Sequence, residues 1–567
     1  MPVKRVVGVV AGAAMVVAGL VGPEGAHAAP GRETLAWGPC RPAGAAASAG
    51  ATAAPSAGAA LAAVTRVSGA LGAVIGPPAA ASSVRRAPVH TPGRAAVQCA
   101  TLRVPLDYAE PEGRQITLSL NRVRGTASQR DDHLGALLVN PGGPGGSGLD
   151  LAKYVAAMLP SEVAARYDVI GFAPRGVGPS EPAISCVDPA RFYAPPRPDA
   201  VPKTVDDEAA LVSRARQYAE GCGSRWSWFL PYLTTENSAR DMDAIRAALG
   251  EDKISYLGYS YGTYLGAVYA TLFPQRVRRL VLDSNVDPDG VWYDANISQD
   301  YSFDRRHRDF LDWVARNDDA YRLGATEQAV HDAWYSMRSR LRVKPGGGLV
   351  GPSELDDIYS AGGYSNALWP ALGAAFSAYV RKGDTAALVK LFHSQAEIKK
   401  TEENSYAVYL GVECRDARWP RSWDRWHVDT LKVNAEAPFM AWPNAVYNAP
   451  CAFWPVPGLT PVRVGAVSLP PILLIQAEHD AATPYAGAVH LRRRFPTASL
   501  VTEGGGNHGV SLSGNSCVDR YLSAYLRDAS LLPQRRTSAR GMRRGDAWCP
   551  ALPDPKPQAP AAARRAR

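Results

Sequence analysis

Residues 254–266 read ISYLGYSYGTYLG and place Ser260 at the centre of a G-x-S-x-G pattern. A short apolar run precedes this serine, and the segment that follows it predicts a helix that ends at Pro274. A serine on a sharp turn between a buried strand and a helix exposes its hydroxyl above the sheet. The bare pattern occurs by chance in Gly-rich chains, but this strand-to-helix context predicts that Ser260 is a nucleophile.

The segments on both sides of this turn predict a mostly parallel, doubly wound sheet. Apolar strands are expected at 135–140, 167–172, 278–284 and 470–480. A helix is expected at 234–250, with Thr235 as its N-cap and Gly250 as its stop. Earlier in the chain, 99–108 and 115–125 alternate between apolar and polar residues as antiparallel strands do. Strands that alternate with helices are typical of the α/β class.

The strand rhythm stops between residues 286 and 468. This stretch is helical in texture and holds nine of the thirteen tryptophans. We predict that it forms a large, mainly helical cap over the active face, because it interrupts the sheet between two strands. The alternative is a structural side domain with a Trp-filled core, and the two interpretations are compatible.

Composition and charge exclude some classes of function. The chain has 567 residues, of which 46% are hydrophobic and 20% charged, as in globular proteins. The net charge of +9 comes without a basic stripe interleaved with aromatic residues, so we expect no nucleic-acid partner. Beyond the N-terminus no stretch approaches the roughly 20 apolar residues of a membrane span, so we expect no stable membrane association. We also expect a monomer.

The N-terminus and the cysteines predict a secreted, extracellular protein. Lys4 and Arg5 precede an apolar stretch and a small-residue site that ends at Ala28, which is the pattern of a signal peptide. A membrane anchor is the weaker alternative, because no positive flank follows. Eight cysteines without a CxxC pair favour disulfides over a metal site in an oxidising compartment. Pairing between sequence neighbours is the simplest of the 105 arrangements: Cys40–Cys99, Cys186–Cys222, Cys414–Cys451 and Cys517–Cys549.

A serine nucleophile needs a base and an orienting acid, which follow it in the order Ser, acid, His in this kind of sheet. Of the ten histidines, His508 lies in the glycine-rich loop EGGGNHG after a strand-like segment. Asp480 ends the strand 470–480 and begins a polar turn, which makes it the predicted acid. Asp283, at the end of another strand, is the alternative acid.

The oxyanion of the reaction also needs hydrogen-bond donors. One is expected to be the backbone N–H of Tyr261, directly after the nucleophile, and the other to come from the loop 140–148, NPGGPGGSG. This loop lacks the G-K-[ST] ending of a phosphate-binding loop. Glu478 and His479 stand beside Asp480, but neighbouring strand residues point to opposite faces, so we expect neither a metal nor a cofactor.

The motifs NPGGPGGSG, GFAPRGVGPS, GYSYGTYLG, LIQAEHDAATPYAGA and GGGNHG, in this order, resemble the α/β-hydrolases related to prolyl aminopeptidase. In particular, the chain from about Cys99 to Cys549 is similar to the secreted tripeptidyl aminopeptidases. Its last part, with Cys414, Cys451, Cys517 and Cys549, resembles the C-terminal region of that subgroup. The resemblance implies Ser260, Asp480 and His508 as the triad, with Gly143 and Tyr261 as oxyanion donors. Two positions depart from the family pattern, namely Ala173, where Asp is usual, and His479, where Leu is frequent.

This resemblance implies a serine exopeptidase that acts on peptides with a free N-terminus through an acyl-enzyme. Such an enzyme must hold an α-ammonium group, and Glu413 and Asp416 in the predicted cap are the candidate carboxylates. Their alternative role is a surface salt bridge with Arg415 or Arg418. The alternative functions are a secreted carboxylesterase or lipase with the same triad, and a non-catalytic binding module on a hydrolase scaffold.

The predicted organisation follows from these assignments. We predict a signal peptide at 1–28 and an N-terminal segment with a low-complexity flexible insertion at 29–98. The first part of an α/β-hydrolase core is expected at 99–285, the helical Trp-rich cap at 286–468 and the second part of the core at 469–550. A disordered basic tail is expected at 551–567.

Overall fold

The computed structural model describes residues 35–40, 96–128, 130–529 and 545–558. The predicted signal peptide at 1–28 lies outside these residues. The predicted low-complexity insertion also lies outside them up to residue 95, and so does the basic tail from residue 559 on.

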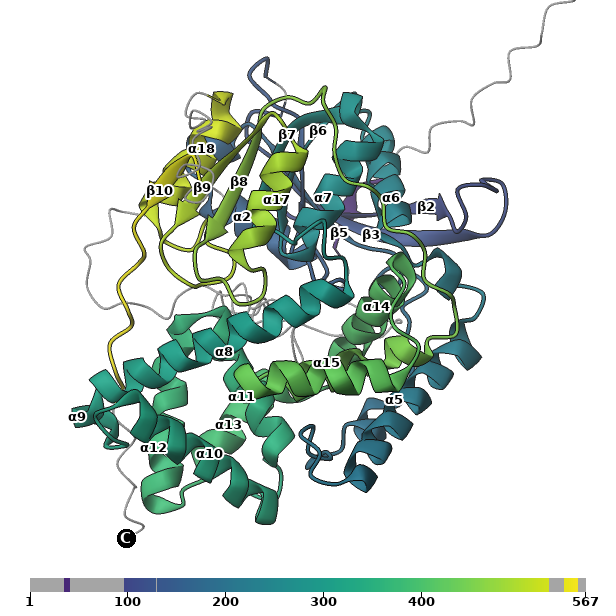
Figure 1. The fold of residues 1–567 in the computed structure, drawn as a ribbon. Helices are drawn as coiled ribbons and strands as arrows, with labels where there is room; N and C mark the ends of the chain where they lie inside the picture. Colours follow the sequence, from purple (N-terminus) through teal and green to yellow (C-terminus); the bar gives the residue numbers. More distant parts are fainter. Residues whose placement is uncertain (1–34, 41–95, 129, 530–544, 559–567) are drawn as a thin grey trace, which may run out of the picture. The chain divides into compact units, whose positions relative to one another are not determined.

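A sheet of ten strands runs through the described part of the chain in the order β1-β2-β3-β5-β4-β6-β7-β8-β9-β10 (Figure 1). The strands are β1 (Gly38–Pro39), β2 (Gln98–Pro105), β3 (Gln115–Val123), β4 (Ala136–Asn140), β5 (Asp168–Ala173), β6 (Ile254–Tyr259), β7 (Val277–Asp283), β8 (Ile472–Ala477), β9 (Ala498–Glu503) and β10 (Ala547–Cys549). Strands β1 to β3 pair antiparallel, β3 pairs antiparallel with β5, and all pairs from β5 to β10 are parallel. The predicted mostly parallel sheet is confirmed.

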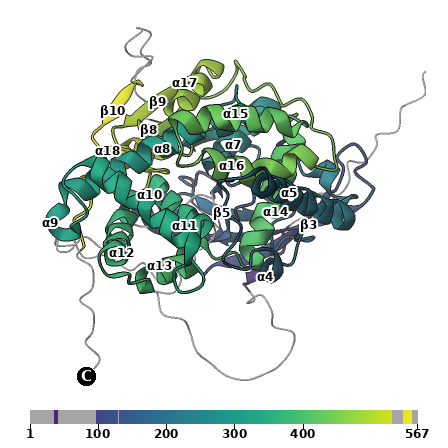
Figure 2. The same cartoon turned by 60° about the horizontal axis from the view of Figure 1, so that its bottom comes forward.

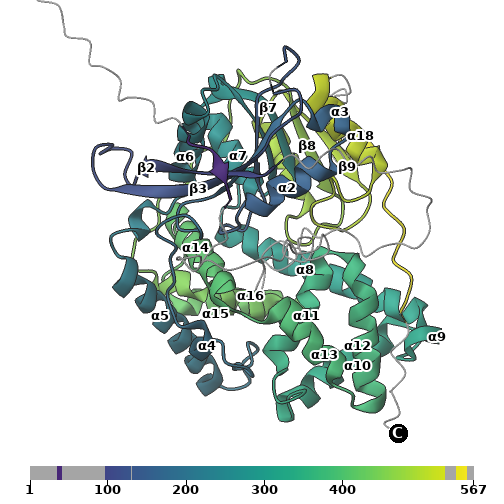
Figure 3. The ribbon, with the colours of Figure 1, turned by 180° about the vertical axis from the view of Figure 1, so that it is seen from behind.

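Helices cover both faces of this sheet, because successive strand residues point to opposite sides. Leu138 packs in a cluster with Val268 and Met242, whereas its neighbour Leu137 packs with Leu151 and Leu522. The first face carries α6 (Thr235–Ala248), α7 (Tyr261–Leu272) and α17 (Tyr485–Arg494), and the second α2 (Leu149–Met158), α3 (Ser161–Ala164) and α18 (Ser516–Asp528) (Figures 1 and 3).

Helix α6 begins one residue away from the predicted cap. The side chain of Thr234, not that of Thr235, accepts the hydrogen bond from the Asn237 N–H. Gly250 follows the C-cap residue in the left-handed conformation, φ +74°, as expected of a helix stop. Thr235 is the first residue of the helix, and its hydroxyl donates to Asp416, a residue far along the chain.

The segment between β7 and β8 is helical, as predicted. Its elements are α8 (Tyr293–Arg316), α9 (Asp318–Tyr321), α10 (Glu327–Val343), α11 (Pro352–Tyr364), η3 (Asn366–Leu368), α12 (Trp369–Lys382), α13 (Ala386–Leu391), η4 (Phe392–Ala396), α14 (Lys400–Asp416), α15 (Trp423–Glu436), α16 (Ala441–Asn448) and η5 (Ala449–Phe453). Trp313, Trp334 and Trp369 lie in a hydrophobic core of this segment, whereas Trp292 and Trp419 pack in the cluster of the sheet. The tryptophans therefore both fill a core of their own and join this helical layer to the sheet.

A second, unforeseen part of the chain joins this helical layer. Between β5 and α6, the chain forms α4 (Pro189–Phe192), α5 (Val205–Trp226) and η1 (Leu230–Tyr232). Helix α5 packs against η5 and α16, as the view from below shows (Figure 2). Thr204 and Asp207 form a capping box at its start. The layer next to the active face is therefore built from two separate chain segments.

All four predicted disulfides are confirmed. Sequence neighbours pair: Cys40–Cys99, Cys186–Cys222, Cys414–Cys451 and Cys517–Cys549. The second bridge joins α5 to the segment before α4, and the third joins α14 to η5. The fourth joins α18 to the edge strand β10. Within the described ranges, no helix has both the length and the apolar character needed to cross a bilayer.

The prediction of disorder from residue 551 on is wrong for residues 551–558. The Trp313 indole N–H donates to the Pro555 carbonyl at 3.2 Å, and the Gln558 N–H donates to the Tyr321 hydroxyl at 3.1 Å. Asp554 also forms an ion pair with Arg316. Buried indole and hydroxyl groups need partners, and this segment supplies them.

Candidate active site

Ser260 lies on the turn between β6 and α7 with φ 57° and ψ −128°. This backbone conformation costs a residue other than glycine about 1–3 kcal/mol, so the surroundings must hold it. The Ser260 N–H donates to the Asp283 carbonyl at 3.0 Å, and the Ser260 carbonyl accepts from the Thr263 N–H at 2.8 Å. At Gly262 a Cβ would lie 2.8 Å from the Asn140 carbonyl oxygen, so this position of the predicted pattern requires glycine.

His508 and Asp480 form a buried pair. The His508 Nδ1 atom lies 3.0 and 2.9 Å from the two carboxylate oxygens of Asp480. The N–H groups of Ala482 and Thr483 and the Thr483 hydroxyl donate to the same carboxylate and orient it. Because Nδ1 faces a carboxylate, it carries the hydrogen, and Nε2 keeps its lone pair. Among the described residues Nε2 has no hydrogen-bond partner, so it is free to accept a proton.

Asp283, the alternative acid, has a different function in the structure. Its carboxylate accepts hydrogen bonds from the Ser511 N–H at 2.7 Å, the Ser511 hydroxyl at 2.5 Å and the Val510 N–H at 3.3 Å. Burial raises its pKa. Asp283 therefore holds the loop directly after His508 with its side chain, and holds Ser260 with its carbonyl.

A cavity opens next to Ser260, with an empty volume of about 730 Å³ that includes the solvent space at its mouth. Its lining comes from both layers: Gly143, Ser260, Tyr261, Val286, Asp287, Trp292, Ala295, Asn296, Ser298, Gln299, Tyr364, Tyr409, Glu413, Ala482, Thr483, Pro484, Ala486 and Gly487. His508 is not itself part of this lining, but it contacts two of the lining residues. The backbone N–H of His508 donates to the Tyr364 carbonyl at 2.8 Å, and its Nδ1 atom lies 3.4 Å from the Thr483 hydroxyl.

The two expected oxyanion donors lie on the wall of this cavity. Tyr261 is the first residue of α7, where the backbone N–H has no acceptor within the helix. Gly143 has φ +114°, a conformation that only glycine adopts without strain. A Cβ at the neighbouring Gly142 would lie 2.9 Å from the Tyr261 nitrogen, which shows how closely the glycine loop approaches that N–H.

Comparison with known proteins identifies the family. Residues 135–514 match the model of the alpha/beta hydrolase fold family. The chain is 48% identical over 439 residues to the tripeptidyl aminopeptidase of Streptomyces lividans, with 76% of this chain and 81% of that protein covered. The chain belongs to the α/β-hydrolase family. The expected fold class and the expected class of enzyme, a serine hydrolase, are thereby confirmed.

Two further relatives of this α/β-hydrolase come from Mycobacterium tuberculosis. The serine protease Hip1 is 35% identical over 459 residues, which cover 77% of this chain and 86% of that protein. Carboxylesterase B is 34% identical over 479 residues, which cover 81% of this chain and 90% of that protein. Relatives with peptidase names and a relative with an esterase name thus share most of this chain.

Glu413 lies in the wall of the cavity of this α/β-hydrolase, on helix α14, with 3% of its surface exposed. The Asn296 amide donates to its carboxyl group at 3.4 Å, and the Tyr409 hydroxyl lies beside that group. Burial raises the pKa of Glu413 well above its usual value. Because Glu413 is buried, the alternative role of a surface salt bridge does not apply to it. Ionising a buried carboxyl group that has no cationic partner is costly, and a cationic ligand would offset that cost.

Asp416 does not line the cavity, so the structure gives no support to its predicted contact with substrate. Its carboxylate accepts from the Thr235 N–H at 2.9 Å and from the Thr235 hydroxyl at 2.5 Å. The Thr235 hydroxyl in turn lies 2.7 Å from the Tyr261 hydroxyl. Burial raises the pKa of Asp416 to about 7. Asp416 therefore connects α14 to the residue that follows the predicted nucleophile.

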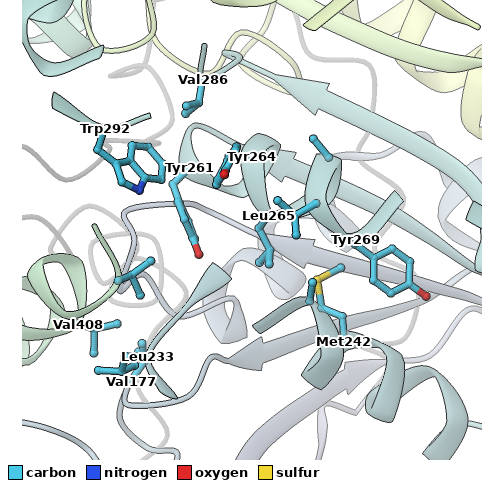
Figure 4. Packing of buried hydrophobic residues seen from close by; sticks show 14 of the residues in the cluster. Val177, Leu233, Met242, Tyr261, Tyr264, Leu265, Tyr269, Val286, Trp292 and Val408 are labelled. Atoms are coloured by element: carbon cyan, nitrogen blue, oxygen red, sulfur yellow. The ribbon is translucent and has the colours of Figure 1, made fainter. Parts of the chain in front are cut away.

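Aromatic side chains around Tyr261 complete this wall of the cavity. Figure 4 shows Trp292 beside Tyr261 and Tyr264, with ring centroids 6.0 and 5.1 Å away. The same view shows Val408 of α14 against Val177 and Leu233 of the core. Helix α14 is thus packed onto the sheet layer close to Ser260.

Several cavity residues were not predicted from the sequence. Tyr409 stands four positions before Glu413 on α14, and this helical spacing was a usable signal for it. Trp292, Asn296 and Tyr364 gave no local signal, because only the packing of α8 and α11 brings them to Ser260.

Two groups of polar residues near this site bear on metal binding. Glu478 and His479 are exposed whereas Asp480 is buried, so these three neighbours do not converge. Asp287, Asp289 and His490 do lie close together. The carboxylate of Asp287 already pairs with His490, and that of Asp289 pairs with Arg494.

Proposed function

We propose that this protein is a serine exopeptidase that removes a short peptide, such as a tripeptide, from the free N-terminus of its substrate. The observation that carries the proposal is a buried carboxyl group, Glu413, in the same cavity as Ser260. The activity for which the Streptomyces relative is named, tripeptidyl aminopeptidase, supports it.

In the proposed reaction the Ser260 hydroxyl attacks the carbonyl carbon of the scissile peptide bond, and His508 Nε2 takes its proton. Asp480 keeps His508 in the required tautomer and stabilises the imidazolium. The N–H groups of Gly143 and Tyr261 donate to the oxyanion, and each such donor contributes about 3–4 kcal/mol in comparable enzymes. The imidazolium then protonates the leaving amine, and water hydrolyses the acyl-enzyme in the same way.

Glu413 would hold the α-ammonium group of the substrate. An ammonium ion offers three N–H donors and a positive charge, which together compensate for burying the carboxylate. The distance between Glu413 and Ser260 along the cavity would then set how many residues are released. This geometry would also exclude substrates whose N-terminus is blocked.

The name of carboxylesterase B favours one alternative, an esterase with the same triad. Three substrates distinguish the two functions: a tripeptidyl p-nitroanilide with a free amine, its N-acetylated form, and p-nitrophenyl acetate. The exopeptidase should cleave the first and not the second. Cleavage of the ester alone would refute the proposal in favour of the esterase.

Labelling by a fluorophosphonate tests the proposed nucleophile. Ser260→Ala should abolish labelling and lower kcat by about 10⁶-fold, because the triad acts as a unit. Ser298→Ala, which changes another serine of the same cavity, should retain both. Labelling that persists in Ser260→Ala would exclude Ser260 as the nucleophile.

We further propose that the enzyme acts outside the cytoplasm. Four disulfides fit an oxidising compartment. The signal peptide expected from the sequence would direct its export. Peptides with a free N-terminus in that compartment would be its substrates.

A further inference from the structure

The two side chains that contact Glu413 are both held by a third residue, Asn448. Its Nδ2 group donates to the Asn296 Oδ1 atom at 3.2 Å, and its Oδ1 atom accepts from the Tyr409 hydroxyl at 2.9 Å. Asn448 lies on α16 with 1% of its surface exposed and is not part of the cavity wall. It thus connects the neighbours of Glu413 without touching Glu413 itself.

Backbone carbonyls fix the orientation of the asparagine amides in this cluster, because a carbonyl oxygen can only accept. Asn296 Nδ2 donates to the Trp292 carbonyl at 3.0 Å, which leaves Asn296 Oδ1 as the acceptor for Asn448. Asn448 Nδ2 donates to the Asn444 carbonyl at 3.1 Å, which leaves Asn448 Oδ1 to face Tyr409. The amide assignments, otherwise ambiguous in a structure, are therefore determined.

A buried carboxyl group extends the same cluster. Asn444 Nδ2 donates to Asp300 Oδ1 at 2.8 Å and to the Asn296 carbonyl at 3.1 Å. Because Asn448 Nδ2 has two hydrogens, the Asn444 carbonyl and Asn444 Oδ1, at 3.1 and 3.0 Å, share one of them, and the other goes to Asn296. Asp300 thus supports the orientation of Asn444, and Asn444 that of Asn448.

These directions decide which atoms can meet a ligand next to Glu413. The Tyr409 hydroxyl has one hydrogen, and Asn448 takes it, so the Tyr409 oxygen is left as an acceptor. Glu413 is an acceptor when ionised. Asn296 Nδ2 reaches one carboxyl oxygen of Glu413 at 3.4 Å and holds that group in place. The subsite therefore presents acceptors to a ligand, which matches an ammonium group and not a carbonyl group.

We propose that Asn448 is a positioning residue that makes the Glu413 subsite selective for a free α-ammonium group. This inference rests on the proposed exopeptidase function. Without Asn448, the Tyr409 hydrogen could turn to Glu413, and Asn296 could rotate away. The subsite would then lose both an acceptor and its fixed carboxyl group.

The test compares Asn448→Leu with Asn404→Leu in the full-length protein. Asn404 is also an asparagine of the helical layer and bonds to Gly176, Gly178 and Ile184, away from Glu413. Asn448→Leu should raise KM for the free-amine tripeptidyl p-nitroanilide about tenfold, the effect of one or two lost hydrogen bonds. Its kcat for this substrate and its kcat/KM for p-nitrophenyl acetate should stay within about twofold of wild type. Asn404→Leu should leave KM unchanged.

An unchanged KM in Asn448→Leu, or an equal loss on peptide and ester, would overturn the inference while leaving the exopeptidase function intact. If wild type itself shows no preference for the free amine over the acetylated peptide, the function is wrong and the inference is wrong with it. If Asn448→Leu does not fold, Asn448→Ser replaces it. A serine fits the space but cannot bridge Asn296 and Tyr409, so the same rise in KM is expected, and its absence is equally decisive.

Discussion

Replacing Glu413 by glutamine separates recognition of the substrate N-terminus from the chemistry at Ser260. The substitution keeps the shape of the side chain and an oxygen that can accept from Asn296, but it removes the charge. Because Glu413 is almost fully buried, solvent cannot replace the lost interaction with an ammonium group. We expect KM for free-amine peptides to rise while the hydrolysis of small esters is unaffected.

The size of the effect follows from the burial of the site. Two unit charges about 4 Å apart attract by about 4 kcal/mol at an effective dielectric constant of 20. The hydrogen bond from the ammonium group to the glutamine oxygen still has one charged partner and retains about 1.5–3 kcal/mol. Because burial raises the pKa of Glu413, part of the remaining free energy is used to ionise the carboxyl group. We therefore expect kcat/KM to fall about 5- to 50-fold, since 1.4 kcal/mol corresponds to a factor of ten.

The assay measures kcat and KM for the free-amine tripeptidyl p-nitroanilide and for p-nitrophenyl acetate as functions of pH. As pH falls through the raised pKa of Glu413, the carboxyl group gains a proton and wild-type KM should rise. Glu413→Gln has no such group, so its KM should not show this rise. Glu403→Gln is the matched control, because Glu403 is a buried glutamate of the same helix that binds the Cys186 N–H and the Tyr218 hydroxyl instead.

Equal losses on peptide and ester in Glu413→Gln would refute this reasoning, because they would show a general disturbance of the active site. An unchanged KM for the peptide would refute it as well. The proposed subsite for the N-terminus would then have to lie elsewhere in the cavity.

Two further substitutions test how His508 is held. Asp283→Asn should lower kcat about 100-fold at constant KM. The substitution places an amide against the Ser511 N–H and displaces the loop after His508 by a fraction of an ångström or more. A change in kcat below threefold would contradict this prediction. Asn507→Ala should lower kcat about tenfold, because Asn507 exchanges hydrogen bonds of 2.9 and 3.1 Å with Asn366. In a double-mutant cycle, Asn366→Ala should add little to Asn507→Ala, and full additivity of the two losses would show that the pair is not coupled.

Much of the core could be predicted because each signal is local. The strand before Ser260, the glycines around it and the helix after it lie within one short segment, and the structure forms the elbow there. His508 and Asp480 each follow a strand of a parallel sheet, and the ends of neighbouring strands meet at one edge. The disulfides also pair cysteines close in sequence, where the simplest arrangement was correct.

The helical layer could not be predicted to the same depth. Glu413 and Asp416 lie on one helix about 4.5 Å apart along its axis, and nothing in the sequence separates a cavity residue from one bound to Thr235. The contribution of α5 was missed because its segment is polar and has no neighbouring strand. Asn296, Asn444 and Asn448 belong to two helices whose packing alone brings them together.

The helical layer is fixed to both halves of the proposed catalytic site. Asp416 connects α14 to Tyr261 through Thr235, and Asn366 connects the end of α11 to the His508 loop. A rigid opening of this layer would break both connections and displace an oxyanion donor and the base together. We infer that this layer stays in place while substrate enters, and the end of a peptide passes beneath a fixed layer more readily than the middle of a folded chain does. For the proposed enzyme, cleavage near a terminus follows from this architecture, and Glu413 then decides which terminus is accepted.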